Sequence, residues 1–138
     1  MTAEDIIERL ELSPHPEGGW YRQTWIGPET PRASGTCIYF LLKEGERSHW
    51  HRVDATEIWH FYAGSPLILR MAETSEGPAQ ALLLGPDLAQ GQTPQIIVPE
   101  NYWQAAEATT GWTLVGCTVS PGFRFEGFEL APPGFDIP

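Results

Sequence analysis

The feature that most constrains the fold of this chain is a succession of short segments rich in aromatic and β-branched residues, separated by Gly, Pro, Asp and Asn. Such segments favour β-strands, and the separating residues favour turns. Because no regular alternation with helices occurs, the pattern predicts an all-β antiparallel sandwich or barrel. The expected strands cover residues 20–25, 36–42, 48–52, 57–63, 67–71, 79–84, 95–98, 102–106, 112–119 and 123–130.

The two ends of the chain differ from this pattern. Thr2 and Asp5 have the spacing of a capping box, and the apolar residues that follow lie on one helical face, so we expect a short helix over 3–11. The segment 13–19 contains two prolines and two glycines and cannot continue that helix. The proline-rich tail 131–138 cannot pair as a central strand, and we expect it along the surface.

Length and charge limit the classes of function. A chain of 138 residues predicts a single domain over 1–138, with one pocket. Its net charge of -10 argues against nucleic acid and anionic membrane surfaces as partners. No apolar run approaches the roughly 18 residues of a membrane span, and an acidic N-terminus is unlike a signal peptide, so we expect a cytoplasmic protein. Cys37 and Cys117 lack CxxC spacing and are expected to be reduced.

A segment with two histidines and a glutamate is the strongest candidate site. In an extended strand His49 and His51 project from the same face, and a hairpin through 53–56 would return Glu57 beside them. Two imidazoles and a carboxylate can bind a divalent metal or carry out proton transfer without one. His60 has the opposite parity to Glu57 and is expected to point out of the barrel.

This segment resembles the first cupin motif, in which a His-x-His pair precedes a Glu and then a Gly. The spacing from Glu57 to Gly64 matches, whereas the spacing from His51 to Glu57 is about one residue longer than usual. The second cupin motif is best matched by residues 99–104, with Asn101 in place of the turn glycine and Gln104 in place of the last histidine ligand. The resemblance implies His49, His51, Glu57 and Gln104 as metal ligands, and Gln104 would make that set a weak one.

Several segments in order narrow the resemblance to the cupin-5 family, formerly the DUF985 group. They are HPEGGWY (15–21), TCIYFLL (36–42), HR (51–52), EIWHFYAG (57–64), PGF (121–123) and FEGFEL (125–130). The resemblance covers nearly the whole chain. It implies a double-stranded β-helix jelly roll related to the sugar-nucleotide epimerase cupins, and a homodimer. It implies no settled reaction.

Further candidates would contact the ligand. Trp59, Phe61 and Trp103 could stack on a flat ring, although aromatic residues more often pack in the core. Tyr102 could donate a hydrogen bond. Glu17 and Arg22 flank a glycine-rich turn that lies near the pocket in the resembling family, and surface charges are the alternative.

Three functions remain open, with a fourth, structural reading. The first is a metal-independent isomerase or epimerase that acts on a sugar-like or nucleobase-like molecule, with His51 as base and Glu57 orienting it. The second is a metal-dependent oxygenase or isomerase, and the third is a binding module without turnover. Absence of a cofactor is favoured over a divalent metal ion. The fourth reading takes the tryptophans as marks of an oligomer interface.

Overall fold

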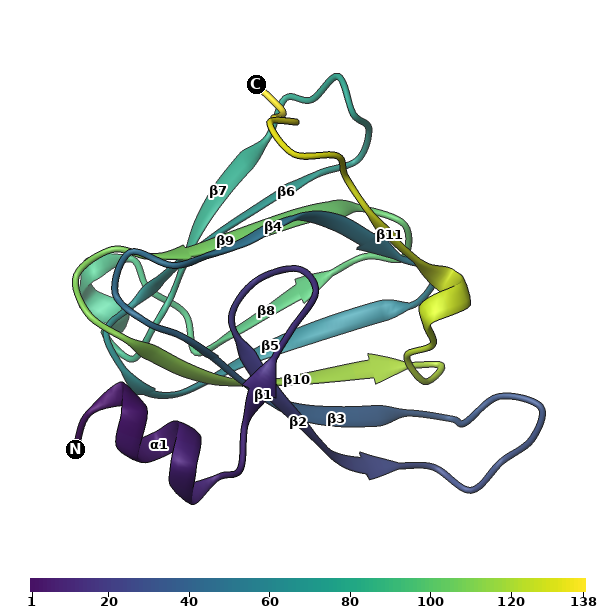
Figure 1. Ribbon diagram of the computed structural model, residues 1–138. Helices are drawn as coiled ribbons and strands as arrows, with labels where there is room; N and C mark the ends of the chain where they lie inside the picture. The colour runs from purple at the N-terminus through teal and green to yellow at the C-terminus, as the bar shows by residue number, and fades with distance from the viewer.

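Two antiparallel sheets face each other in the computed structural model, which describes residues 1–138 (Figure 1). One sheet has the order β1-β2-β3-β10-β5-β8 and the other has the order β11-β4-β9-β6-β7. The strands are β1 (Ser13–Pro14), β2 (Trp20–Ile26), β3 (Thr36–Leu42), β4 (Arg47–Val53), β5 (Thr56–Gly64), β6 (Leu67–Ala72), β7 (Gln80–Leu84), β8 (Gln95–Val98), β9 (Trp103–Ala108), β10 (Thr113–Ser120) and β11 (Phe128–Leu130). The helices are α1 (Ala3–Arg9) and the 3-10 turns η1 (Leu88–Gln90) and η2 (Phe125–Gly127).

The expected strands are found within two residues at each end, with one exception. The prediction of a continuous strand over 123–130 is wrong, because only Phe128–Leu130 pairs, as β11. The chain leaves one sheet after β10 and must cross to the other before β11 can pair with β4. A 3-10 turn at Phe125–Gly127, closed by a hydrogen bond from the Gly127 amide to the Arg124 carbonyl, makes this crossing.

The main core lies between the two sheets. Alternate residues of β3, β5, β6 and β10 turn inward, which follows from the period of two along a strand. Phe40, Trp59, Leu69 and Val115 are each at most 2% exposed in this cluster. Burial of these apolar side chains stabilises the sandwich. The apolar cluster does not fill the whole space between the sheets, and polar side chains occupy one end of it.

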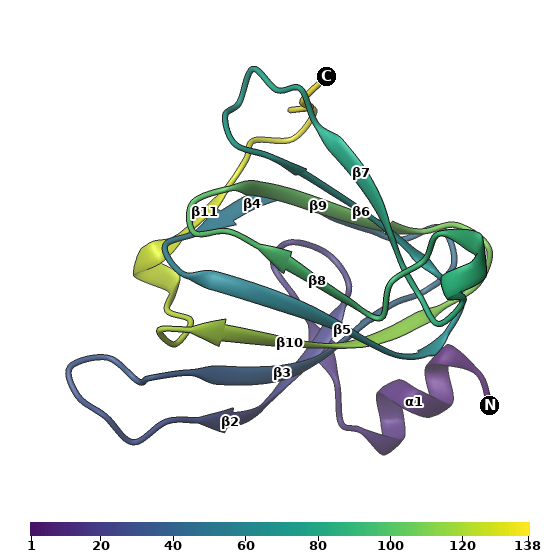
Figure 2. The same cartoon turned by 180° about the vertical axis from the view of Figure 1, so that it is seen from behind.

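The ends of the chain cover the outer surfaces. The Thr2 side chain caps α1 in the expected capping box, and Ile6 packs against Leu41. The helix ends at Arg9 rather than at residue 11, where Glu11 has a positive φ. The tail lies over the outer face of β4 and β9 (Figure 2), but it is more than a surface segment because Ile137 is only 4% exposed.

The loop between β1 and β2 joins the two sheets. It rises from the first sheet toward β4 (Figure 1), where the amide of His49 donates to the carbonyl oxygen of Glu17 at 2.7 Å. Gly18 has a φ of 106°, and a Cβ at this position would overlap the carbonyl oxygen of Arg47. The close approach of this loop to β4 therefore requires glycine at residue 18, and it carries Glu17 to the gap between the sheets.

No helix of the protein is both long enough and sufficiently apolar to cross a lipid bilayer.

Candidate functional site

A cavity of about 210 Å³ opens between the sheets, at the end near η2. Residues from the β1–β2 loop, from β2, β3, β4, β5 and β10, and from the segment between β10 and β11 surround it, and none of them is Arg or Lys. The lining consists of His15, Glu17, Tyr21, Gln23, Thr36, Ile38, His51, Val53, Glu57, Cys117, Val119, Phe123 and Phe125. The cavity thus combines two glutamates and two histidines with aromatic and aliphatic walls.

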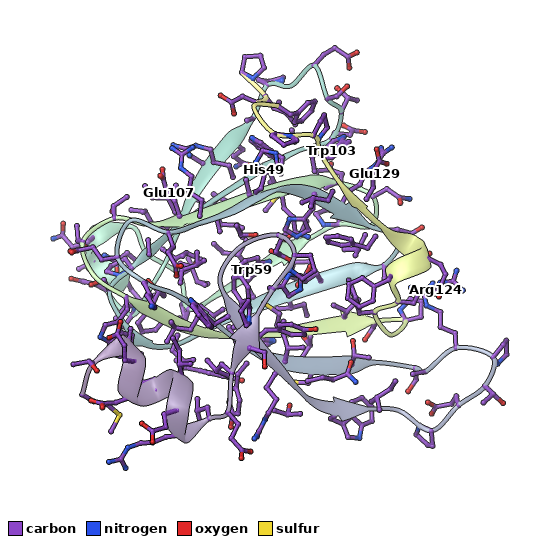
Figure 3. The ribbon with its side chains drawn as sticks, viewed as in Figure 1. His49, Trp59, Trp103, Glu107, Arg124 and Glu129 are labelled. Atoms are coloured by element: carbon purple, nitrogen blue, oxygen red, sulfur yellow. The ribbon has the colours of Figure 1, made fainter.

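A bulge in β4 decides which histidine enters this cavity. Ser48 pairs with Ala106 and His51 with Gln104, so three steps along β4 match two along β9. The expectation that His49 and His51 share a face is therefore wrong. His51 lines the cavity, whereas the His49 ring lies on the outer side of the sheet (Figure 3), with Nε2 3.0 Å from the carbonyl oxygen of Pro132.

The hydrogen bonds of His51 fix its neutral tautomer. Its Nδ1 lies 2.8 Å from the carbonyl oxygen of His49 and must donate, because a carbonyl only accepts. In the neutral ring Nε2 then carries a lone pair, and it lies 3.5 Å from Oε2 of Glu17. Burial lowers the pKa of His51, opposed by the nearby carboxyl of Glu57. The site therefore presents an unprotonated ring nitrogen to the cavity.

Glu57 is held by a chain of hydrogen bonds that starts in the core. The indole nitrogen of Trp59 is only a donor, so Gln104 accepts with Oε1 at 2.8 Å and its amide nitrogen faces Glu57. That nitrogen donates to Oε1 of Glu57 at 2.9 Å. Burial raises the pKa of Glu57 to about 7. Gln104 itself is fully buried behind the cavity, and it orients Glu57 rather than facing a ligand.

Glu17, on the β1–β2 loop, is the second glutamate in the lining of the cavity. The Ser48 hydroxyl donates to Oε2 of Glu17, and Oε1 lies 3.3 Å from Nδ1 of His15. Burial raises the pKa of Glu17 to about 8. Burial also lowers the pKa of His15 to about 4, and its Nδ1 accepts the backbone N–H of Glu17. His15 and Glu17 are therefore two neutral groups at pH 7, and the contact between them is not an ion pair.

The four ligands expected for a metal ion are not assembled. His49 lies outside the barrel, and the amide oxygen of Gln104 is already engaged by Trp59. The described residues contain no group of three or more His, Cys, Asp or Glu side chains arranged to hold a metal ion. The set His49, His51, Glu57 and Gln104 does not fit a metal.

Other expected ligand contacts fall elsewhere. Trp59 is a core residue that is 1% exposed, and Phe61 and Tyr102 pack against the same core rather than lining the cavity. Trp103 lies on the outer face of its sheet (Figure 3), where it contacts Phe135 and the guanidinium of Arg52. Arg22 pairs with Glu11 on the surface at 3.1 Å. Of the expected ligand contacts, only Glu17 lines the cavity.

The sequence reasoning missed part of the lining. Ser48 does not line the cavity itself, but it turns inward and bonds to Glu17 because of the bulge, which has no sequence signal. His15 appeared only inside a family segment, and Cys117 was expected only to be reduced, yet both line the cavity. The alternation along β10, in which Val115, Cys117 and Val119 are all buried, could have placed Cys117 on the inner face.

The mouth of the cavity is aromatic and is braced by one carboxylate. Phe123 and Phe125 line the cavity, with ring centroids 5.0 Å apart. Asp54 accepts from Arg32 at 2.7 Å and from Arg124 at 3.2 Å, which joins the β2–β3 loop, the β4–β5 turn and the segment before η2. Arg124 lies beside η2 in Figure 3. This brace holds the segment that carries both phenylalanines.

The chain was compared with protein-family models and with solved structures, and both comparisons match the same family of proteins. The family model described as "Cupin superfamily (DUF985)" matches residues 4–131. A crystal structure of a protein from Shewanella oneidensis is 43% identical, with a TM-score of 0.89 over 95% of this chain and 85% of that one. A hypothetical protein from Leishmania major is 30% identical, with a TM-score of 0.88 over 98% of this chain and 90% of that one.

More distant structures share the fold alone. Oxalate decarboxylase from Bacillus subtilis is 14% identical, with a TM-score of 0.66 over 85% of this chain and 29% of that one. A cupin-2 domain protein from Rhodospirillum rubrum is 13% identical, with a TM-score of 0.61 over 90% of this chain and 76% of that one. A comparison with functionally curated proteins finds no match. The expected cupin jelly roll with a short N-terminal helix is confirmed.

Proposed function

The chain belongs to the Cupin_5 (DUF985) family of the cupin superfamily, and we propose that it is a metal-independent enzyme of the isomerase or epimerase type. The proposed substrate is a small sugar-like or nucleobase-like molecule bound between the sheets. The observation that carries the proposal is the unprotonated Nε2 of His51, which a hydrogen bond from Nδ1 to a carbonyl keeps free to accept a proton.

The neighbours of His51 suit proton abstraction. When Nε2 takes a proton from a substrate carbon, the ring becomes an imidazolium in a buried site. The ionised form of Glu57 would stabilise that charge, because its carboxyl interacts with His51 electrostatically. Gln104 and Trp59 hold Glu57 in place. A buried base with an oriented carboxylate is a common arrangement for removing a proton from carbon.

The cavity walls suit a small ring or a polyhydroxy compound. Tyr21, Phe123 and Phe125 offer aromatic faces, and Gln23 and Thr36 offer hydrogen-bonding groups. The volume of about 210 Å³ is below the roughly 300–1,000 Å³ of drug-sized ligand sites. A compact substrate fits better than one carrying a large leaving group or a second ring system.

The proposal is tested by hydrogen exchange at carbon. The purified protein is incubated in D₂O with a panel of small aldehydes, ketones and heterocycles, charged and uncharged, and loss of each C–H signal is followed by proton NMR. We expect exchange with at least one compound, reduced about 100-fold or more in His51→Gln. The matched control is His60→Gln, because His60 lies outside the cavity and bonds to Thr118.

Two outcomes would contradict the proposal. Equal exchange rates in His51→Gln and in the unsubstituted protein would remove His51 as the base. Binding of a panel compound without any exchange would instead identify a binding module, the alternative that the same cavity supports.

A further inference from the structure

The carboxyl group of Glu17 faces hydrogen-bond acceptors at both of its oxygens. Nδ1 of His15 accepts the backbone N–H of Glu17 at 3.1 Å, so its lone pair is used there, and it lies 3.3 Å from Oε1. Nε2 of His51 carries a lone pair because Nδ1 holds the ring proton, and it lies 3.5 Å from Oε2. Neither ring nitrogen offers a proton to the carboxyl in the neutral tautomers.

Among the remaining neighbours, only Ser48 favours an ionised carboxyl, and its effect on the pKa of Glu17 is smaller than that of burial. Ser48 supplies one hydroxyl donor to Oε2, and the other titratable groups near the site are the Glu57 carboxyl and the Cys117 thiol. No Arg or Lys lines the cavity, and Asp54 engages the arginines at its mouth, Arg32 and Arg124. Apart from Ser48, the polar atoms nearest the carboxyl of Glu17 are two ring nitrogens with lone pairs, and repulsion between these acceptors and the carboxyl is relieved when the carboxyl carries a proton. Burial acts in the same direction.

We propose that Glu17 is a carboxylic acid in the resting site, that it is the proton donor complementary to His51, and that the cavity takes an uncharged carbonyl compound. This inference rests on the proposed function for its catalytic part. The two groups lie in reach of each other and of the same cavity, so a ligand bound there can contact an acid and a base together.

The step balances without a further reactant. Nε2 of His51 takes the proton from the carbon next to the carbonyl, and the C–H electron pair forms the carbon–carbon double bond of an enol. The carbonyl oxygen receives the proton of Glu17. The products are the enol, an imidazolium on His51 and a carboxylate on Glu17, and return of the two protons at exchanged positions completes an isomerisation or an epimerisation.

The charge of the wall sets the class of ligand. A carboxylate or phosphate on the ligand would enter a cavity with two glutamates and without a cation to pair with. Removing such an anion from water without a partner is strongly unfavourable. An uncharged carbonyl oxygen instead accepts a hydrogen bond from the protonated Glu17 at no such cost.

The proton on Glu17 can be observed without any ligand. Infrared spectra at pH 7 resolve the carbonyl band of protonated carboxyl groups from that of carboxylates. We expect this band in the wild-type protein, with its larger part lost in Glu17→Gln and unchanged in Glu129→Gln, whose carboxylate pairs with Arg52 on the surface. In the wild-type protein, nitrogen NMR of His51 should show a proton on Nδ1 alone, a readout that needs no variant. An ionised Glu17 or a doubly protonated His51 overturns the proposal.

Ligand class is tested with an isosteric pair, pyruvamide and pyruvate, by NMR titration of the cavity residues. We expect pyruvamide to shift the signals of His51 and Phe123, and pyruvate to shift them little at the same concentration. In Glu17→Gln, pyruvamide should still bind while exchange of its methyl protons in D₂O falls about 100-fold or more. Preference for pyruvate, or no binding of pyruvamide, overturns the ligand class. Pyruvamide that binds wild-type protein without exchange refutes the proposed enzyme but leaves the ligand class standing.

Discussion

The amide nitrogen of Gln104 lies 2.9 Å from Oε1 of Glu57 and donates a hydrogen bond to it, while its oxygen accepts from Trp59. The resemblance to the second cupin motif puts Gln104 in place of the last histidine ligand, whereas in the structure Gln104 holds Glu57 in position. The amide can do this because it offers a donor and an acceptor at once, which neither a carboxylate nor a hydrocarbon can.

Gln104→Glu should destabilise the protein in a pH-dependent manner. The substitution keeps the acceptor for Trp59 but replaces the donor to Glu57 by a second buried carboxyl. We expect a loss of about 2 kcal/mol in the free energy of unfolding, increasing as the pH rises and the new carboxyl ionises. Urea denaturation at pH 6 and pH 8 measures it. Gln80→Glu, at an exposed position of β7, is the matched control and should change little. Equal losses at the two pH values would contradict the proposed contact.

The stability of the wild-type protein should fall between about pH 6.5 and pH 8. The pKa of Glu17 is raised to about 8 and that of Glu57 to about 7, so above their ordinary pKa the folded state binds more protons than the unfolded state. The lowered pKa values of His15 and His51 act in the opposite direction, but only below about pH 6.5.

Glu17→Gln isolates one part of this pH dependence. A glutamine cannot ionise, so the variant should lose less stability than the wild type between pH 6 and pH 8.5, by about 2 to 3 kcal/mol. Chemical denaturation across this range gives the difference. Glu129→Gln, on the surface, should follow the wild-type curve. Parallel curves for Glu17→Gln and the wild type would show that Glu17 ionises normally.

Asp54→Asn should loosen the mouth of the cavity with little effect on global stability. The ion pairs of Asp54 with Arg32 and Arg124 are partly exposed, and such pairs contribute about 1 kcal/mol or less each. Because they join three loops, we expect faster amide exchange over residues 121–127 than in the wild type. The comparison variant is Glu129→Gln, which removes a surface pair with Arg52 and should leave exchange over 121–127 unchanged.

The tail should contribute measurably to stability. Ile137 is 4% exposed against Trp50 and Trp103, so Ile137→Ala should cost about 2 kcal/mol in the free energy of unfolding. Ile97, on β8, is 59% exposed, and Ile97→Ala should cost about 0.5 kcal/mol or less. Thermal and urea denaturation of the two variants test this difference, and a similar cost for both would show that the tail is not packed as described.

Local patterns predicted most of the fold, whereas most of the site depended on long-range packing. Strand positions follow from composition and turns, and the positive φ of Asn101 confirms its role as the turn residue. His51 and Glu57 both line the cavity, as the alternation of side chains along a strand predicts. His49 was misplaced because a bulge changes parity without a local signal, and Trp103 because its indole covers the outer face instead of the inner one.

The bulge in β4 shifts the alternation of side chains between the two faces of the strand by one residue. Because β4 has one more residue than β9 over this stretch, the β4 side chains before the bulge face the opposite side from the one that strict alternation predicts. Ser48 thereby reaches Glu17, and His49 is left to bind the tail. The His-x-His pair that predicts a metal site from the sequence is thus divided between the inner and the outer face of the sheet. Relatives that carry the same pair can therefore differ in chemistry if a one-residue bulge is present in one and absent in the other.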